Sequence, residues 1–373
     1  MNDSSIRFPF KLGFGLMRLP KLADGGIDIP QVCEMADHFL QAGGTYFDTA
    51  YTYDGGKSEE AFRAAVAERY PREAYTLATK LLVNAGGIAC EADAKAELTT
   101  SLARTGAGYF DFYLLHAIQR SNVDKYEEYH LWDYVREMKE KGLIRHWGFS
   151  FHADSELLEE LLEKHPDAEF VQLQINYADW ENPGVASRKN WEICKAHGKP
   201  VVIMEPVKGG VLADPIPEVR AVFDRADSNR TYASWALRYA ASLDNILTVL
   251  SGMSSLAQMD DNLRSIRDIP LNEEEMGFIR KAQEALNNDK SIACTACHYC
   301  TKGCPMNIPI PEIFNVVNRR KGSPEFRTLR EYCIVTRGRG KASDCIGCGQ
   351  CESFCPQHLP IIRLLEECRS LEG

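Results

Sequence analysis

Residues 45–80 read TYFDTAYTYDGGKSEEAFRAAVAERYPREAYTLATK. An apolar run, Tyr46–Ala50, precedes an amphipathic stretch, Ser58–Arg69, and a second apolar run, Tyr75–Lys80, follows it. Short and nearly continuous apolar runs are typical of strands buried on both faces of a parallel sheet. The stretch between them has apolar residues at helical spacing and is followed by Pro71, which ends a helix. The segment therefore predicts a strand, a crossover helix and a parallel strand.

The same alternation continues to about residue 266. Strands are expected at Gly13–Met17, Tyr46–Ala50, Tyr75–Lys80, Asp111–His116, Arg145–Ser150, Phe170–Ile175, Pro200–Glu205 and Ile246–Ser251. Helices are expected at Ile29–Ala42, Ser58–Arg69, Glu91–Thr105, Lys125–Lys141, Ser155–Lys164, Ala186–His197, Thr231–Leu243 and Ser255–Ile266. Eight strand–helix units in roughly 250 residues predict an α/β fold, the closed (β/α)8 TIM barrel.

An open doubly wound sheet is the alternative arrangement of such units. That fold normally has a Gly-x-Gly-x-x-Gly turn directly between its first strand and first helix. Here the first strand reads Gly13-Phe14-Gly15-Leu16-Met17, which lacks the third glycine, and no helix follows directly. The sequence therefore favours the closed barrel.

Composition excludes several classes of protein. The 373 residues are 45% apolar and 26% charged, which is typical of a folded globular chain and not of a disordered or coiled-coil one. No stretch approaches the roughly 20 apolar residues of a membrane span, and the N-terminus lacks the apolar core of a signal peptide. The net charge of −10 argues against nucleic acid or a membrane surface as partner. A cytoplasmic protein is expected.

A helix expected at Asn272–Leu286 marks a change in composition. The residues beyond it are rich in cysteine, interrupted by prolines and poor in apolar periodicity. Such a short segment builds only a small core and is expected to fold around metal. The sequence thus predicts a barrel domain over residues 1–285 and a small, mainly α-helical domain over residues 286–373.

Eight of the 13 cysteines form two runs with identical spacing. Each run reads Cys-x2-Cys-x2-Cys-x3-Cys-Pro, the pattern of bacterial 4Fe–4S ferredoxins, in which the fourth cysteine ligates the other cluster. Zinc sites usually have two Cys-x2-Cys pairs with a longer gap, and disulfides are not expected without an export signal. Two 4Fe–4S clusters in a ferredoxin-like domain are therefore predicted. One is held by Cys294, Cys297, Cys300 and Cys355, and the other by Cys345, Cys348, Cys351 and Cys304.

Four polar residues gather at the ends of three consecutive strands. Asp48, Lys80 and His116 lie at the ends of the second, third and fourth strands, and Tyr53 follows Asp48 in the loop. Taken singly, such a histidine is more often structural, and such a lysine more often reaches the surface. Because the C-terminal ends of barrel strands carry catalytic residues, their occurrence together predicts one active site.

These residue types suit the reduction of a carbonyl group by hydride, which leaves an alkoxide that needs a proton. Tyr53 is expected to donate it, because the Lys80 ammonium stabilises the phenolate and lowers a pKa that is ordinarily about 10. Asp48 keeps Lys80 charged and oriented, and His116 hydrogen-bonds the substrate oxygen.

The segment Gly43–Tyr53, followed by Gly55-Gly56 and Ser58-Glu59, resembles the signature of the aldo/keto reductase superfamily. The resemblance covers about residues 8–266, and the complete chain resembles a prokaryotic subgroup with a C-terminal 4Fe–4S dicluster domain. It implies an oxidoreductase that acts on a small carbonyl or alcohol substrate. The tetrad Asp48, Tyr53, Lys80 and His116 would carry the reaction, with Tyr53 as proton donor.

The resemblance also implies which residues bind the cofactor. Ser150 and Gln172 match the family's carboxamide ligands, and Met204 replaces the tyrosine that stacks on nicotinamide. Gly252 and Gln258 replace the cations that select NADP, so NAD(H) is expected to be preferred over NADP(H), or neither to be preferred. Further cofactor contacts are implied at Gly15, Met17, Pro206, Lys208, Gly210, Ser254 and Asn262.

The clusters leave a second hypothesis open. Nicotinamide transfers two electrons together as hydride, each cluster transfers one, and a flavin can do both. The alternative is therefore a reductase in which a flavin in the barrel passes electrons between the clusters and the substrate. The basic run Arg319-Arg320-Lys321 is a candidate docking site for an acidic redox partner, although most such runs are solvated faces.

Overall fold

The structure, a computed structural model, describes residues 8–84, 86–287, 291–319 and 325–372. Its first compact unit comprises Met1–Val207 and Leu212–Gln283, and its second comprises Lys208–Val211 and Glu284–Gly373. Among the helices of the described residues, none is both long enough and apolar enough to cross a bilayer.

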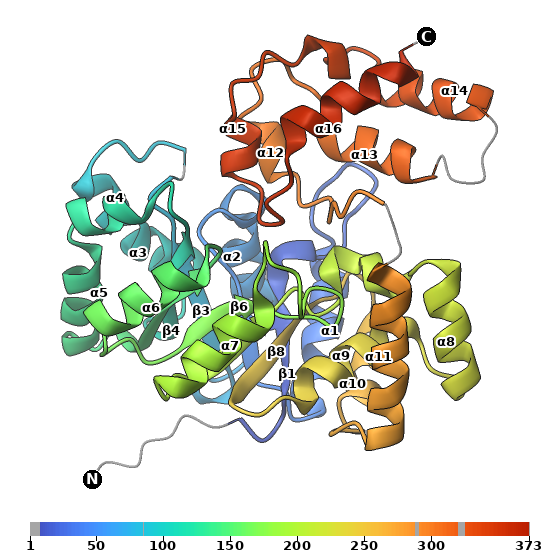
Figure 1. The fold of residues 1–373 in the computed structure, drawn as a ribbon. Coiled ribbons are helices and arrows are strands. Elements are labelled where there is room, and N and C mark those ends of the chain that lie inside the picture. The colour runs from blue at the N-terminus through green and yellow to red at the C-terminus, as the bar shows by residue number, and fades with distance from the viewer. Residues whose placement is uncertain (1–7, 85, 288–290, 320–324, 373) are drawn as a thin grey trace. The chain divides into compact units, whose positions relative to one another are not determined.

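The first unit is a closed barrel of eight parallel strands, each hydrogen-bonded to the next, with the eighth pairing with the first (Figure 1). The strands are β1 (Leu12–Gly15), β2 (Tyr46–Asp48), β3 (Thr76–Leu81), β4 (Phe110–Ile118), β5 (Ile144–Phe151), β6 (Val171–Gln174), β7 (Val201–Met204) and β8 (Ile246–Gly252). All eight predicted strands are present, so the TIM barrel is confirmed and the open sheet was the wrong alternative.

Helices cover the outside of the barrel (Figure 1). They include α1 (Ile29–Gln41), α2 (Lys57–Phe62), α3 (Glu91–Thr105), α6 (Ser155–Lys164), α7 (Ser187–Ala196), α9 (Tyr232–Ser242), α10 (Leu256–Ser265) and α11 (Glu273–Asn287). Local signals explain their bounds, as in α1, where the Asp28 side chain accepts a hydrogen bond from the Gln31 backbone N–H at 3.2 Å.

Two helix predictions need correction. The stretch Lys125–Lys141 is not one helix, because α4 (Val123–Glu128) and α5 (Leu131–Glu140) are separated at His130, whose φ of 49° is left-handed. The prediction also lacks α8 (Pro217–Asp227), which buries only Val219 and Phe223 and therefore has a weak apolar pattern.

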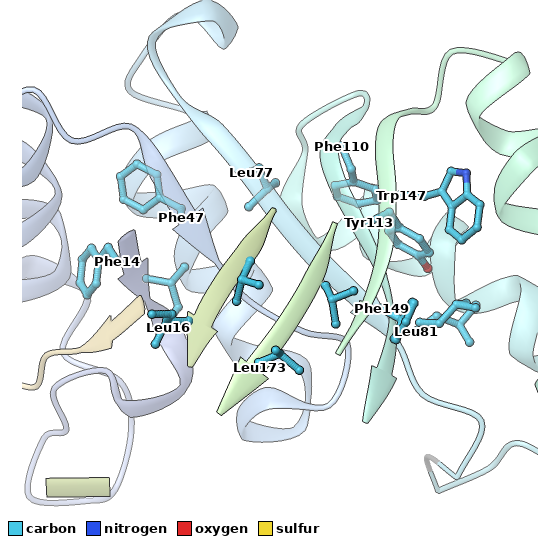
Figure 2. Close-up of a cluster of buried hydrophobic side chains, with 14 of the residues drawn as sticks. Phe14, Leu16, Phe47, Leu77, Leu81, Phe110, Tyr113, Trp147, Phe149 and Leu173 are labelled. Atoms are coloured by element: carbon cyan, nitrogen blue, oxygen red, sulfur yellow. The ribbon is translucent and has the colours of Figure 1, made fainter. Parts of the chain in front are cut away.

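The apolar core lies in two layers, because successive strand side chains point to opposite faces. Inside the barrel, the Phe112 ring centroid lies 5.2 Å from that of Tyr46 and 5.0 Å from that of Phe170. Between strands and helices lies the larger layer, whose members in Figure 2 include Phe14, Phe47, Leu77, Tyr113 and Phe149. Burial of each large apolar side chain contributes roughly 1.5–3 kcal/mol to the free energy of folding. The two layers therefore hold the strands, and the residues at their ends, in place.

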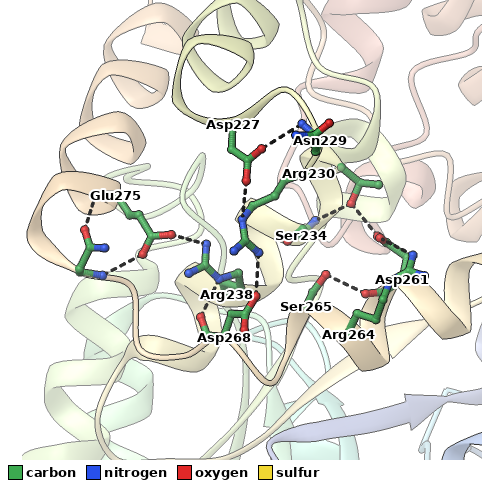
Figure 3. A network of polar contacts seen from close by, with 12 residues as sticks. Asp227, Asn229, Arg230, Ser234, Arg238, Asp261, Arg264, Ser265, Asp268 and Glu275 are labelled. Carbon is green, nitrogen blue, oxygen red and sulfur yellow. Dashed lines mark hydrogen bonds and ion pairs between the residues drawn. The ribbon is translucent and has the colours of Figure 1, made fainter.

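A polar network joins the helices of the last barrel units (Figure 3). The buried Arg238 of α9 donates from Nε to the Asp268 carbonyl oxygen at 2.7 Å, and its Nη1 pairs with Glu275 Oε1 of α11 at 2.7 Å. Thr231 donates to Asp261 of α10 at 2.6 Å. Arginine supplies several donors in one plane, so one side chain ties α9 to the segment that leads into α11.

The second unit is helical. Its elements are α12 (Tyr299–Lys302), α13 (Ile310–Arg319), α14 (Glu325–Val335), α15 (Gln350–Ser353) and α16 (Ile361–Cys368). The expectation of little apolar periodicity was wrong for α13 and α16, which bury Ile313, Phe314 and Leu365 in a small core. Of the predicted basic run, Arg320 and Lys321 lie outside the described residues.

Candidate active site and cluster sites

Asp48, Tyr53, Lys80 and His116 lie together at the C-terminal edge of the barrel. Lys80 Nζ donates to Asp48 Oδ1 and to the Thr49 carbonyl oxygen, each at 2.6 Å. The same ammonium lies 5.0 Å from the centre of the Tyr53 ring. The rings of Tyr53 and His116 meet edge to face with centroids 5.9 Å apart. The structure therefore brings all four predicted catalytic residues into one cluster.

A bulge in β4 shapes the backbone at His116. The pairing of β4 with β5 shifts register between Leu115 and Ile118, and Ala117 has a left-handed φ of 53°. Ser150 Oγ of β5 accepts a hydrogen bond from the freed Ala117 backbone N–H at 2.7 Å. Bulges bend a strand and re-aim its side chains, so Ser150 stabilises the turn at which His116 leaves the regular sheet.

Burial controls the ionisation of the cluster. Lys80 is 0% exposed, and burial lowers its pKa, although the Asp48 carboxylate offsets part of that effect. Burial likewise raises the pKa of Asp48, and Lys80 offsets part of it. Burial, helped by the charge of Lys80, holds the pKa of His116 well below its usual range. His116 is therefore uncharged at neutral pH and can offer one ring N–H as a neutral donor.

A layer of polar contacts that the sequence does not predict lies behind this cluster. The fully buried Glu59 accepts from Thr79 Oγ1 at 2.7 Å and from Arg104 Nη1 at 3.3 Å. Glu59 belongs to the signature segment but shows no sign of a role of its own, and Arg104 has the pattern of an ordinary cation in the last turn of a helix. Only the packing of α2 against α3 brings these two residues together.

The residues assigned to nicotinamide lie at neighbouring strand ends. Ser150 Oγ accepts from Ala117, which leaves its hydroxyl proton available to a ligand. Gln172 of β6 donates from Nε2 to Met204 Sδ at 3.4 Å, and its buried Oε1 has no hydrogen-bond partner among the described residues. A free hydroxyl donor and a free amide oxygen fit the carboxamide of nicotinamide, which needs one of each.

The residues assigned to the rest of the cofactor occupy the ends of β1, β7 and β8 and the segments after them. Ser254 N–H donates to Gln258 Oε1 at 2.7 Å, and Asn262 Nδ2 donates to Ser251 Oγ at 2.8 Å. The remaining assigned residues end strands (Gly15, Gly252), follow them (Met17, Pro206) or open the segment Lys208–Ala213, namely Lys208 and Gly210. Gly252 and Gln258, where the resemblance implies the cations that select NADP, are both uncharged.

Cysteines line two cavities of the second unit, each with about 320 Å³ of space when the solvent at its opening is included. One cavity is lined by Cys294, Cys297, Cys300 and Cys355, and the other by Cys304, Cys345, Cys348 and Cys351. The fourth cysteine of each run thus lines the cavity of the other run.

The form of these cavities suits a cluster better than a single ion. A tetrahedral zinc ion needs four sulfurs at about 2.3 Å from one point. Within the described part of the chain, no three His, Cys, Asp or Glu side chains are close enough to hold one metal ion. Each set of thiols surrounds a space instead, so the residues fit a 4Fe–4S cluster in each cavity.

The profile of the aldo/keto reductase family matches residues 11–284. The chain belongs to the aldo/keto reductase family. A profile of the 4Fe–4S dicluster domain matches residues 293–359. The protein is therefore an oxidoreductase enzyme of aldo/keto reductase type that carries a 4Fe–4S dicluster domain.

Known proteins resemble about seven-tenths of this reductase. The "Uncharacterized oxidoreductase YqkF" of Bacillus subtilis is 23% identical over an alignment of 300 residues, and the match covers 71% of this chain and 90% of that protein. The solved holo form of an aldo-keto reductase from Bacillus halodurans is 27% identical with a TM-score of 0.60, covering 73% of this chain and 91% of that one. An aldo/keto reductase from Klebsiella pneumoniae, solved with NADP and acetate, is 22% identical with a TM-score of 0.59 at the same coverage.

A buried carboxyl in the reductase barrel should make its stability depend on pH. Glu97 Oε2 of α3 accepts from the Leu82 backbone N–H at 2.9 Å, and its Oε1 has no partner among the described residues. Burial raises the pKa of Glu97 from 4.5 to about 8. The folded chain therefore keeps this proton up to about pH 8, whereas the unfolded chain releases it above 4.5. Between those values Glu97 destabilises the fold progressively as the pH rises.

Glu97→Gln keeps an oxygen acceptor for Leu82 and cannot ionise. We expect the variant to gain little unfolding free energy at pH 5 and roughly 4 kcal/mol at pH 9. All five tryptophans lie within the barrel, so denaturant unfolding followed by tryptophan fluorescence reports on this unit alone. A difference between variant and wild type that stays constant from pH 5 to 9 would show that Glu97 is ionised in the folded chain.

Proposed function

We propose that this reductase transfers hydride between a nicotinamide cofactor and a small carbonyl or alcohol substrate, with Tyr53 as the proton donor. The observation that carries the proposal is the buried Lys80–Asp48 ion pair, whose ammonium lies 5.0 Å from the Tyr53 ring. A bound NADH or NADPH supplies the hydride.

Each residue of the tetrad has a distinct task. The Tyr53 hydroxyl protonates the substrate oxygen during reduction, and the Lys80 ammonium stabilises the phenolate that remains. Asp48 keeps Lys80 charged in a site where burial alone would favour the neutral amine. His116, neutral because of its burial, donates a hydrogen bond that orients the same substrate oxygen.

We assign nicotinamide rather than a flavin to the barrel. Ser150 and Gln172 offer a hydroxyl donor and an amide acceptor of the kind that a carboxamide requires. The Klebsiella relative was solved with NADP, which supports a cofactor of that class here. Mixing anaerobically purified protein with NADH or NADPH and a series of aldehydes tests the proposal, and failure to oxidise either cofactor would overturn it.

The cysteine cavities are proposed to hold the two 4Fe–4S clusters. Cys294, Cys297, Cys300 and Cys355 would bind one cluster, and Cys304, Cys345, Cys348 and Cys351 the other. Bound clusters supply one-electron transfer. A redox protein is the partner class that such a domain fits, because the chain beyond residue 285 has more Lys and Arg than Asp and Glu although the whole chain carries −10.

Cofactor preference should follow the missing cations. Gly252 and Gln258 offer no charge to a 2′-phosphate, so NADH should bind at least as tightly as NADPH. A side chain at Gly252 would meet its nearest neighbour, Arg18 Cβ, at 3.5 Å, which is ordinary contact. Gly252→Lys should therefore tighten NADPH by about tenfold and leave NADH unchanged, as measured by titration. A wild-type preference for NADPH of about a hundredfold, or 2.7 kcal/mol, would mean that another cation does this work.

A further inference from the structure

The segment that carries Tyr53 has an unusual backbone. Asp54, Gly55 and Gly56 follow Tyr53 with φ values of 50°, 66° and 94°, so three consecutive residues are left-handed. Glycine adopts this conformation freely, but Asp54 does so at a cost. The backbone bonds from Tyr53 N–H to the Ala50 carbonyl at 3.1 Å and from Gly55 N–H to the Thr52 carbonyl at 3.2 Å join residues of the same loop. Contacts from outside are therefore needed to keep Tyr53 in one place.

Arg104, in the last turn of α3, supplies such contacts on both sides of Tyr53. Its Nη1 donates to the Tyr51 carbonyl oxygen at 3.0 Å, and its guanidinium lies 4.5 Å from the centre of the Tyr51 ring. On the other side it pairs with the buried Glu59 at 3.3 Å. A Cβ on Gly56 would lie only 2.5 Å from the guanidinium carbon, so the guanidinium packs directly against that backbone.

We propose that Arg104 is a positioning residue for the proton donor, and this rests on the proposed role of Tyr53. Its planar guanidinium holds the segment from Tyr51 to Glu59 in place and thereby keeps the Tyr53 ring close to the Lys80 ammonium. Glu59, which pairs with Arg104, also accepts a hydrogen bond from Thr79, the residue before Lys80 in β3. Arg104 thus links the Tyr53 loop to β3 without touching the substrate.

The shape of the side chain and its charge make different predictions. Lysine has the same charge but one compact ammonium, which cannot bond Tyr51, pair with Glu59 and stack on a ring at once. If Arg104 acts through geometry, Arg104→Lys should resemble Arg104→Met. If it acts only through charge, Arg104→Lys should resemble the wild type.

The control variant is Arg63→Met. Arg63 lies just after α2, contacts α3 through the Ala103 carbonyl oxygen at 3.5 Å and pairs with Glu68 at 2.8 Å. Arg63 therefore bridges to the same helix as Arg104, and among the described residues it forms no hydrogen bond or ion pair with the Tyr53 segment. Its loss should leave turnover unchanged.

The experiment measures kcat, KM and their pH dependence for the full-length wild type, Arg104→Lys, Arg104→Met and Arg63→Met. Both Arg104 variants should lose about 10–100-fold in kcat, because a displacement near 1 Å is enough for such a loss, while the KM for the cofactor changes by less than about twofold. Lys80 from β3 and His116 from β4 contact the Tyr53 ring, and Asp48 from β2 pairs with Lys80. Moving the hydroxyl away from the Lys80 ammonium disfavours the phenolate. The fall of kcat at high pH should therefore shift to still higher pH in both variants.

Three outcomes would overturn the proposal. These are a wild-type kcat in Arg104→Met, a wild-type pH profile in Arg104→Lys, and a loss in Arg63→Met as large as in the Arg104 variants. Should Arg104→Met not fold, Arg104→Lys keeps the charge of the ion pair and still decides between geometry and charge. Tyr53→Phe, measured in the same assay, separates the two proposals, since its full activity would defeat the proposed function itself.

Discussion

Tyr53→Phe is expected to reduce the kcat of carbonyl reduction by about 10²–10⁴-fold, which is the contribution typical of a positioned general acid. The variant removes one hydroxyl from a ring that keeps its contacts with Lys80 and His116. Folding and cofactor binding should therefore remain, and steady-state oxidation of NADH in the presence of an aldehyde measures the loss. Turnover near the wild-type value would mean that another acid donates the proton.

The contribution of the Lys80 ammonium to turnover is best tested with a double variant. Lys80→Met alone would leave the Asp48 carboxylate buried and unpaired, and breaking a buried pair in this way costs about 3–5 kcal/mol. Lys80→Met combined with Asp48→Asn removes both charges and keeps similar volumes. A kcat loss comparable to that of Tyr53→Phe, in a variant whose barrel still unfolds cooperatively, would assign the loss to the missing ammonium.

The sequence predicts the barrel and the tetrad because both depend on local patterns. Buried parallel strands are continuous apolar runs, and the C-terminal ends of consecutive strands lie at one edge of the barrel regardless of the length and conformation of the loops. The sequence alone therefore groups Asp48, Lys80 and His116 in one site. The break at His130 could not, because it depends on one left-handed residue inside an otherwise helical pattern.

Contacts between helices are harder to predict. Arg104 and Glu59 are 45 residues apart and meet only because α2 packs against α3. Neither residue has a signal of its own, since a cation in a last helical turn and a glutamate in a first turn are both ordinary. The bulge in β4, where Ala117 N–H bonds Ser150, is equally hard to predict. The alternation of side chains along a strand does not reveal where an extra residue is inserted.

Variants of the cluster-binding cysteines are expected to lose iron. Cys355→Ser and Cys304→Ser should each lower the iron content from about eight to about four atoms per chain, because each removes one thiolate from one 4Fe–4S cluster. The cavities make the prediction more specific. Cys355 lines the cavity of the first run and Cys304 that of the second, so each variant should disturb the cluster of the other run.

The spectra of paired variants distinguish this crossed arrangement from an uncrossed one. Cys355→Ser and Cys297→Ser should leave the same cluster and so give the same spectrum, and Cys304→Ser should match Cys348→Ser. If the runs were uncrossed, Cys355→Ser would match Cys348→Ser instead.

Metal removal should increase proteolysis within residues 291–372, since ligation supplies much of the ordering free energy of so small a core. The tryptophan fluorescence should show that the barrel remains folded. Two zinc atoms per chain, or equal protection with and without metal, would instead indicate a structural tail on a plain reductase.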